Sequence, residues 1–299
     1  MIRKQLIVAI DVLLICGGIL NAAWAGQVVT EDVKAWARRA IEQEKAVGGL
    51  PAPNTVAVLY FRNLTGQADL DPLQHGLPVM LITDLSKVKS LNVVERVRLQ
   101  ALAEELDLGA SGLVAEGGAP RVGRLLGANW LVDGNLAASQ QTPLQIKSSV
   151  LVVPAKQVAG QPAAGGLLDD LFRLEKELLF EIIKLLKVEP TPREEVELRK
   201  PVTTSIKALL DFSRGLEKSD RGSYTEAAGL YERALKQDPG FKLAKEALDE
   251  LHALGLVKKA GASRQLLREL RDRTSLTDQL TPEDSVKRER TPRDVRVDP

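Results

Sequence analysis

Cysteine, histidine and aromatic side chains are scarce in this chain of 299 residues, which has one Cys, two His and only 4% Phe, Trp and Tyr. A single cysteine excludes an intrachain disulfide, and two histidines leave little material for a zinc site or a Cys/His catalytic pair. An excess of one charge is also lacking, because 41 Lys and Arg face 40 Asp and Glu. This balance argues against a basic face for nucleic acid. The 44% of hydrophobic residues can still form an aliphatic core.

The first 25 residues have the pattern of a secretory signal peptide. Two basic residues precede an apolar stretch at 6–20, and an Ala-Trp-Ala sequence ends at Ala25. We expect cleavage after Ala25, so that Gly26 becomes the new amino terminus. The apolar stretch has 15 residues and contains one acid, whereas a spanning helix needs about 20, so a retained membrane anchor is the alternative. In a bacterium, cleavage predicts a periplasmic protein.

The next part of the chain alternates short apolar runs with helical patterns. Pro78 lacks the N–H of a helical hydrogen bond, so the helix in which it lies should begin at or near it. Residues 157–166 are rich in Pro, Gly and Ala and are interpreted as a connection. The order of elements predicts an α/β domain over 26–188, with a mixed β-sheet flanked by helices. Strands are expected at 55–61, 91–95, 130–136 and 144–153, and helices at 30–46, 97–106, 119–126 and 167–188. Residues 73–88 show a helical period, with the regular helix expected from about Pro78 onward.

Beyond residue 188 the pattern is helical and then polar. A connector over 189–203 opens on a capping box, with Thr191 as N-cap, Pro192 at the first helical position and Glu194 three residues after the cap. Residues 204–273 are expected to form an all-α module. Residues 274–299 mix both charges with proline and few large apolar side chains, which predicts a disordered tail.

Several short motifs in the α/β region occur in a recognisable order. They lie at 56–64, 76–85, 92–100, 105–106 and 123–134. Through them, residues 55–136 resemble the amino-terminal domain of TolB and the CsgG family of curli-secretion lipoproteins. The resemblance implies a mixed sheet with helices, a place in the bacterial envelope and no chemistry of its own. Two departures concern the family's secretion pores: Cys16 follows Ile15, which disfavours lipidation, and 130–166 holds one hairpin where a pore member needs two.

Residues 208–241 resemble one tetratricopeptide repeat, a pair of antiparallel helices. Ser223 and Glu226 predict a capping box for the second helix. A single repeat cannot bury its faces alone, so we expect it to pack on the α/β domain, on a second copy or on a partner. The repeat's consensus positions are occupied by Gly215, Gly222, Tyr224, Ala227, Tyr231, Ala234 and Pro239.

Two groups of polar residues are candidates for a site. Asp69, Asp71 and His75 have side chains that suit a hard or borderline metal. The alternative is a polar loop in which Asp71 caps the following helix. Glu95 and Arg96 end the second strand, either as a recognition pair or as a structural ion pair with a neighbouring helix, and we favour the structural role.

These patterns predict a non-catalytic adaptor of the periplasm or cell envelope, with no metal and no cofactor. Its expected partners are envelope proteins or peptide segments and not nucleic acid, whereas self-association and contact with the outer membrane stay open. One alternative is a CsgG-type secretion component at the outer membrane. The other is a metal-dependent enzyme or sensor that uses Asp69, Asp71 and His75.

Overall fold

The computed structural model describes residues 27–44, 53–108, 118–139 and 143–258. The chain divides into two compact units, Met1–Leu256 and Val257–Pro299, and every helix and strand named below lies in the first. The predicted signal peptide, with its cleavage site at Ala25 and Gly26, lies outside the described residues. So does the predicted tail.

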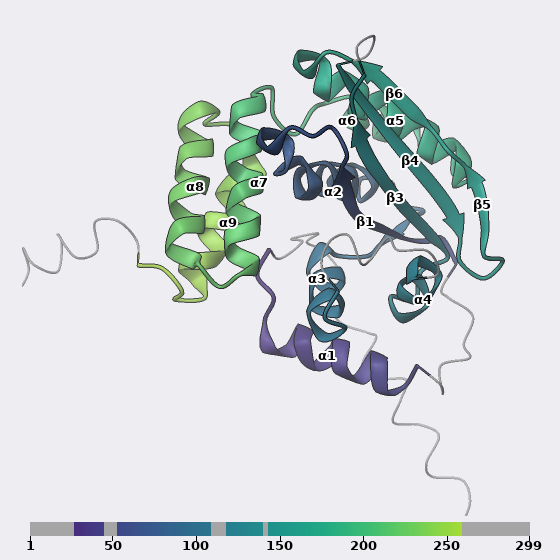
Figure 1. Cartoon of the computed structure of the whole chain (residues 1–299), viewed down its shortest axis with the longest axis horizontal. Coiled ribbons are helices and arrows are strands. Elements are labelled where there is room, and N and C mark those ends of the chain that lie inside the picture. The colour runs from purple at the N-terminus through teal and green to yellow at the C-terminus, as the bar shows by residue number, and fades with distance from the viewer. Residues whose placement is uncertain (1–26, 45–52, 109–117, 140–142, 259–299) are drawn as a thin grey trace, which may run out of the picture. The chain divides into compact units, whose positions relative to one another are not determined.

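A mixed sheet forms the centre of the described α/β region (Figure 1). The strand order is β2-β1-β3-β4-β5, and β6 also pairs with β4. Strands β2 and β3 run parallel to β1, whereas β3, β5 and β6 run antiparallel to β4. The predicted mixed sheet is therefore confirmed. The strands are β1 (Thr55–Asn63), β2 (Asn92–Val93), β3 (Trp130–Ala137), β4 (Leu144–Val152), β5 (Gln157–Gly160) and β6 (Ala163–Gly166).

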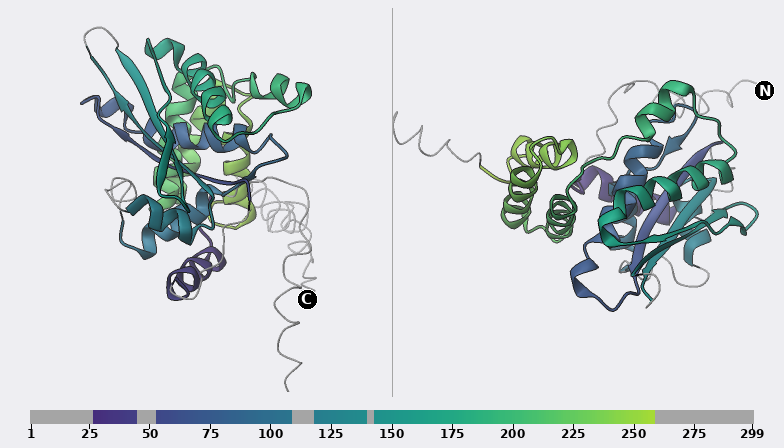
Figure 2. Two further views of the ribbon diagram at one scale, coloured as in Figure 1. Left: turned by 90° about the vertical axis from the view of Figure 1, so that its right-hand side faces the viewer. Right: turned by 90° about the horizontal axis from the view of Figure 1, so that it is seen from above.

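Helices cover both faces of this sheet. On one face, α2 packs on β1 and α5 packs on β4 and β6, as Figures 1 and 2 show. On the other face, α3 and α4 share a hydrophobic cluster with β1 and β3, and α1 packs against the outside of α3. Strand β1 is buried from Thr55 to Phe61, because helices cover it on both sides. The helices are α1 (Glu31–Glu42), α2 (Leu73–Leu85), α3 (Arg96–Glu105), α4 (Gly118–Leu125) and α5 (Leu171–Leu185), with single 3-10 turns at Ala68–Leu70 and Leu168–Asp170.

The predicted start of α2 was wrong. The helix begins at Leu73, five residues before Pro78, which lies inside it. A proline at this position removes only the bond to the carbonyl of Gln74, one turn from the helix start. Leu73 and Leu77 are fully buried, so packing on β1 holds the first turn in place.

The interpretation of 157–166 as a connection was also wrong. Its residues form β5 and β6, which pair with the two ends of β4. Small side chains give no alternating hydrophobic pattern, so the sequence carried no strand signal here. The nine-residue β4 exposes a long row of backbone groups, and pairing with them produces both short strands.

Four further helices follow α5. Thr191 and Glu194 form the predicted capping box of α6: the Thr191 hydroxyl accepts from the Glu194 N–H, and the Glu194 carboxylate accepts from the Thr191 N–H at 2.8 Å. The capping box predicted at Ser223 does not form, because the Glu226 carboxylate instead pairs with Lys218 at 2.6 Å. The helices are α6 (Pro192–Leu198), α7 (Ile206–Asp220), α8 (Tyr224–Gln237) and α9 (Lys242–Ala253). The predicted helical module is thus confirmed as far as the described residues extend.

Two glycines allow close helix contacts around α7. A Cβ at Gly76 of α2 would lie 2.3 Å from the Ser213 hydroxyl, so α2 and α7 meet there. A Cβ at Gly215 would lie 2.4 Å from the ring of Tyr231, which packs α8 against α7. The Phe212 ring lies 5.7 Å from the Tyr231 ring and 5.1 Å from the Phe241 ring. Aromatic side chains therefore fill the space between α7, α8 and the start of α9.

We expect Gly215→Ala to destabilise the protein by about 1 to 3 kcal/mol, because the added methyl group cannot be placed without moving the Tyr231 ring. Gly229→Ala is the matched control, since Gly229 lies on the exposed side of α8 with no atom within 4 Å of an added Cβ. That control should be neutral or stabilising by up to about 1 kcal/mol. Urea unfolding measures both. Equal effects of the two substitutions would contradict the close approach of α7 and α8.

Candidate functional site

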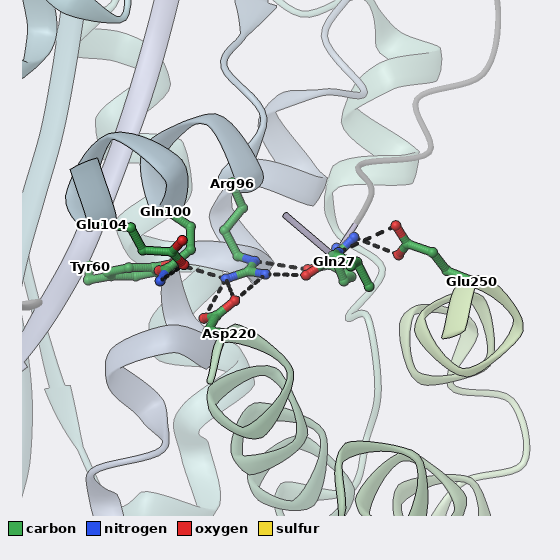
Figure 3. A network of polar contacts seen from close by, with 8 residues as sticks. Gln27, Tyr60, Arg96, Gln100, Glu104, Asp220 and Glu250 are labelled. Atoms are coloured by element: carbon green, nitrogen blue, oxygen red, sulfur yellow. Dashed lines mark hydrogen bonds and ion pairs between the residues drawn. The ribbon is translucent and has the colours of Figure 1, made fainter. Parts of the chain in front are cut away.

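The first turn of α3 places an arginine in the interior of the protein. Arg96 is the first residue of the helix, and only 1% of its surface is exposed. Its guanidinium lies between the sheet and α7, where Figure 3 shows it surrounded by polar groups. A buried guanidinium has five N–H donors to satisfy, so its neighbours decide whether it is tolerated.

Every nitrogen of the Arg96 guanidinium donates to a neighbour. Nη1 donates to both carboxylate oxygens of Asp220, at 3.0 and 2.9 Å, and Nη2 donates to one of them at 3.0 Å. Nη1 also donates to the Tyr60 hydroxyl at 2.9 Å. The remaining donors go to Gln27, from Nε to the side-chain oxygen at 3.0 Å and from Nη2 to the backbone carbonyl at 2.6 Å. These contacts join β1, α3, the end of α7 and the segment before α1.

The network continues in two directions (Figure 3). The Tyr60 hydroxyl donates to Gln100 at 2.7 Å, and the Gln100 amide donates to Glu104 at 3.0 Å. On the other side, the Glu250 carboxylate of α9 accepts from the backbone N–H of Gln27 at 2.7 Å and from that of Val28 at 3.3 Å. A single arginine therefore organises contacts from residue 27 to residue 250.

A cleft lies beside this network, between α3 and α7. We call it the α3–α7 cleft; its volume is about 420 Å³. The His75 ring lies 4.4 Å from the Tyr60 ring and forms part of the lining. A second hollow of about 680 Å³ lies between the turn before α2 and helices α7 and α8. The polar residues that line the α3–α7 cleft include Tyr60, His75, Gln100, Glu104, Asp107, Glu217, Asp220 and Arg221.

Burial shifts the protonation of the groups around the cleft. Burial and the nearby Arg96 charge lower the pKa of His75 to about 4, so this imidazole is neutral at pH 7. Burial raises the pKa of Tyr60, which therefore keeps its proton. Burial alone would lower the pKa of Arg96, but the Asp220 carboxylate raises it, so the guanidinium stays charged. None of these three groups is poised to exchange a proton near neutral pH.

The charged groups that line the α3–α7 cleft are mostly carboxylates. Asp220 is paired with Arg96, and Glu217 is paired with Arg221 at 2.6 Å. Glu104 and Asp107 lie exposed at the rim and give the cleft an excess of negative charge. Within the described residues, no three or more His, Cys, Asp and Glu side chains are grouped as metal ligands. The arrangement can therefore accept a positively charged group by electrostatic complementarity.

The residues proposed for a metal site have separate surroundings. Asp69 is exposed in the turn before α2, and His75 packs against Tyr60. Asp71 accepts a hydrogen bond from the Asn63 amide at 2.7 Å. The predicted cap also differs, because Pro72 occupies the N-cap position of α2 and Asp71 does not cap a backbone N–H. The structure gives the three residues no common metal centre.

The structural interpretation of Arg96 is confirmed, since its partner Asp220 belongs to a neighbouring helix. Its predicted position at a strand end was wrong, because β2 stops at Val93 and Arg96 opens α3. Glu95 is the N-cap residue of α3 and lies 3.9 Å from the guanidinium of Arg98 on the same helix.

The residues assigned to the repeat-like pattern lie within and beside α7 and α8. Gly215 contacts Tyr231, and Gly222 ends α7 with a φ of 72°. Tyr224 is the first residue of α8, whose buried side includes Ala227, Tyr231 and Ala234. Pro239 lies in the turn between α8 and α9.

Sequence reasoning missed Gln27, Asp220 and Glu250, which complete the network around Arg96. Asp220 is 124 positions from Arg96, and Gln27 is 223 positions from Glu250. In the sequence they are polar residues near helix ends, where polar side chains are usually exposed. They become partners in this network only because α7 packs on α2 and Glu250 of α9 contacts the segment before α1.

The comparisons with known proteins agree with the resemblance drawn from the sequence. Residues 39–142 match the family model of CsgG, described as the curli production assembly/transport component. The resemblance to the CsgG family is thus confirmed over this part of the chain.

A curated relative covers more of the chain. It is a protein of Rhizobium meliloti (strain 1021) named putative adenylate cyclase 3, which is 28% identical over 214 residues. The match covers 67% of this chain but only 32% of that protein. The chain thus spans about a third of the length of this relative.

Two solved structures are distantly similar. The LpoB C-terminal domain from Salmonella enterica is 13% identical, with 48% of this chain and 98% of that domain covered at a TM-score of 0.32. The LpoB C-terminal domain from Escherichia coli is 14% identical, with 46% of this chain and 98% of that domain covered at a TM-score of 0.32.

Among the described residues, no helix combines the length and apolar character needed to cross a bilayer.

We expect Arg96→Leu to destabilise the protein by about 3 to 5 kcal/mol, because it leaves the Asp220 carboxylate buried without a counter-charge. Arg98→Leu on the same helix is the control, since Arg98 is half exposed and its ion pair with Glu95 is 3.9 Å long; it should cost less than about 1 kcal/mol. Urea unfolding provides both values. In a double-mutant cycle, Asp220→Leu should cost much less in the Arg96→Leu background than in the wild type. Additive costs would rule out the pairing.

Proposed function

We propose that this chain is a non-catalytic interaction protein of the bacterial cell envelope, in which a CsgG-like α/β domain and the helices α7 to α9 act as one rigid adaptor. The observation that carries the proposal is the match of residues 39–142 to the curli assembly and transport family. The all-α part, α7 to α9, is tied to that domain by the contacts of Arg96 and Glu250. An adaptor needs such a connection if binding of a partner to one part is to change the position of the other part.

The α3–α7 cleft is the proposed contact surface for a partner. It lies at the junction of the two parts, and its rim carries the exposed carboxylates of Glu104 and Asp107. A partner segment with a basic side chain fits this charge. The neutral His75 and the protonated Tyr60 favour recognition over proton transfer.

Two other activities are weaker candidates. A CsgG-type secretion component would need a membrane attachment, for which the alternative of a retained anchor at 6–20 is the available sequence feature. Adenylate cyclase activity belongs to the name of the Rhizobium meliloti relative, of which this chain spans 32%.

Localisation is the first test. The full chain, with a tag at its carboxyl end, is expressed in a bacterium, the cells are fractionated, and the amino terminus is identified by mass spectrometry. We expect a periplasmic product that begins at Gly26. Ala25→Leu is the control, because a bulky residue at the cleavage position should block processing. A cytosolic product that keeps residues 1–25 contradicts the envelope assignment, and a membrane-bound one favours the secretion component.

Cross-linking in cells tests the adaptor itself. The tagged full chain should capture a defined envelope protein, and Glu104→Lys should lower its yield about tenfold, because reversing the rim charge repels a basic segment. Glu232→Lys is the matched control, since Glu232 is exposed on α8 and lines neither hollow. Both variants should unfold at the wild-type urea concentration. Capture that is the same for all three proteins would refute the α3–α7 cleft as the contact surface.

A further inference from the structure

Two buried carboxyl groups contact the same ammonium group, that of Lys176, between helices α2 and α5. Asp84 on α2 and Glu175 on α5 are both completely buried. They belong to the two helices that cover the same face of the sheet. Neither residue lines the α3–α7 cleft or takes part in the Arg96 network. Two buried carboxylates side by side repel each other, so their surroundings must decide how many protons they carry.

Both nearby ammonium groups are directed to Asp84. Lys87 Nζ donates to Asp84 Oδ1 at 2.6 Å, and Lys176 Nζ donates to Asp84 Oδ2. Each oxygen of this carboxylate therefore accepts a charge-assisted hydrogen bond. Lys87 also donates to the backbone carbonyl of Glu197 in α6 at 3.1 Å. Asp84 is consequently well compensated as an anion, even though it is fully buried.

Glu175 is compensated much less. Its nearest cation is Lys176, with Nζ 3.2 Å from Oε2, but this contact lacks hydrogen-bond geometry. In the described structure neither Glu175 oxygen accepts a hydrogen bond. Two lysines and two ionised acids would balance in charge, yet both lysines already bond Asp84. The free energy needed to bury an ionised carboxylate without hydrogen bonds is larger than the stabilisation from the weak Lys176 contact.

We propose that Glu175 keeps its proton in the folded protein at neutral pH and donates it to the Asp84 carboxylate, so that this proton links α5 to α2. The protonated carboxyl has the donor that its position requires, and the pair then carries one negative charge instead of two. The charged groups that face it are Asp84 from α2 and Lys176 from α5 itself, while Lys87 approaches from the Asp84 side and α6 contributes the Glu197 carbonyl.

The titration properties agree with this geometry. Burial, followed by the neighbouring Asp84 charge, raises the pKa of Glu175 to about 8, and Lys176 only partly opposes them. Because the folded pKa lies above the ordinary value of 4.5, the folded state binds the proton more tightly than the unfolded state does. The contribution to stability is therefore complete below pH 4.5. It is lost as the pH rises through about 8.

The contact between α2 and α5 lies next to the connector that leads to α7. Helix α6, which follows α5, is held at the end of α2 by the Lys87 contact and by the Lys89 N–H, which donates to Glu194 at 2.9 Å. Loss of the proton should loosen the contact of α5 with α2. Alkaline pH thus acts next to the connector, away from the α3–α7 cleft.

A carbon-13 NMR titration of the side-chain carboxyl groups tests the proposal directly. In the folded wild-type protein we expect the Glu175 resonance to titrate near pH 8, while exposed glutamates titrate near 4.5. Asp84→Asn removes the neighbouring anion and should shift the Glu175 midpoint to lower pH. A midpoint near 4.5 for Glu175 in the wild type would overturn the proposal.

Unfolding as a function of pH is the second test, and it does not depend on how well Asp84→Asn folds. Glu175→Gln keeps a donor of the same shape without a titrating proton, so the loss of unfolding temperature between pH 5 and pH 9 should be smaller than in the wild type. Glu181→Gln on the exposed side of α5 is the matched control and should keep the wild-type slope. A Glu175→Gln variant with the wild-type slope would also overturn the proposal.

Discussion

The buried pair of Arg96 and Asp220 is the contact on which the arrangement of this protein depends. A guanidinium with 1% of its surface exposed is stable only if its donors are satisfied, and the partners that satisfy it come from β1, α7 and the segment before α1. Moving α7 away from the sheet would leave a buried charge without its partner. The polar network therefore restricts the helix pair to one position, which the aliphatic contacts of α2 and α7 alone would define less strictly.

This restriction explains why a helix pair with a single repeat-like pattern can be part of a stable fold. Gly76 lets α7 approach α2, and Gly215 lets the Tyr231 ring of α8 approach α7. Glu250 then fixes α9 to the segment at Gln27. The pair thus buries its faces against the α/β region, which is one of the three outcomes that the sequence allowed. The α3–α7 cleft follows from the same geometry, because it lies where helices from the two parts meet beside the network.

Helices and strands could be predicted where the signal lay in neighbouring residues, and not where it depended on contacts between distant segments. Helical periodicity and a buried apolar run located α1, α3, α4 and β1, and the capping box at Thr191 followed from three neighbouring residues. Strands β5 and β6 were missed, because pairing with β4 rather than side-chain pattern produces them. Arg96 could be singled out from the sequence, but Asp220 and Gln27 could not, since each became a partner only through packing between distant segments. Elements with a local sequence signal could therefore be predicted, whereas the network around Arg96 could not.

The two buried charge clusters show how the same aliphatic interior treats polar groups in different ways. Around Arg96, each donor has an acceptor, and the Asp220 carboxylate keeps the guanidinium charged. Around Asp84, two lysines donate to the Asp84 carboxylate, and neither donates a hydrogen bond to Glu175. In our proposal, a proton on Glu175 supplies the missing hydrogen bond to Asp84. A fully bonded cluster fixes a position, whereas an incompletely bonded one makes a contact depend on solution conditions. In this chain the first joins α7 to the sheet, and the second lies between α2 and α5. A change of pH is therefore expected to act on the contact between α2 and α5 through Glu175.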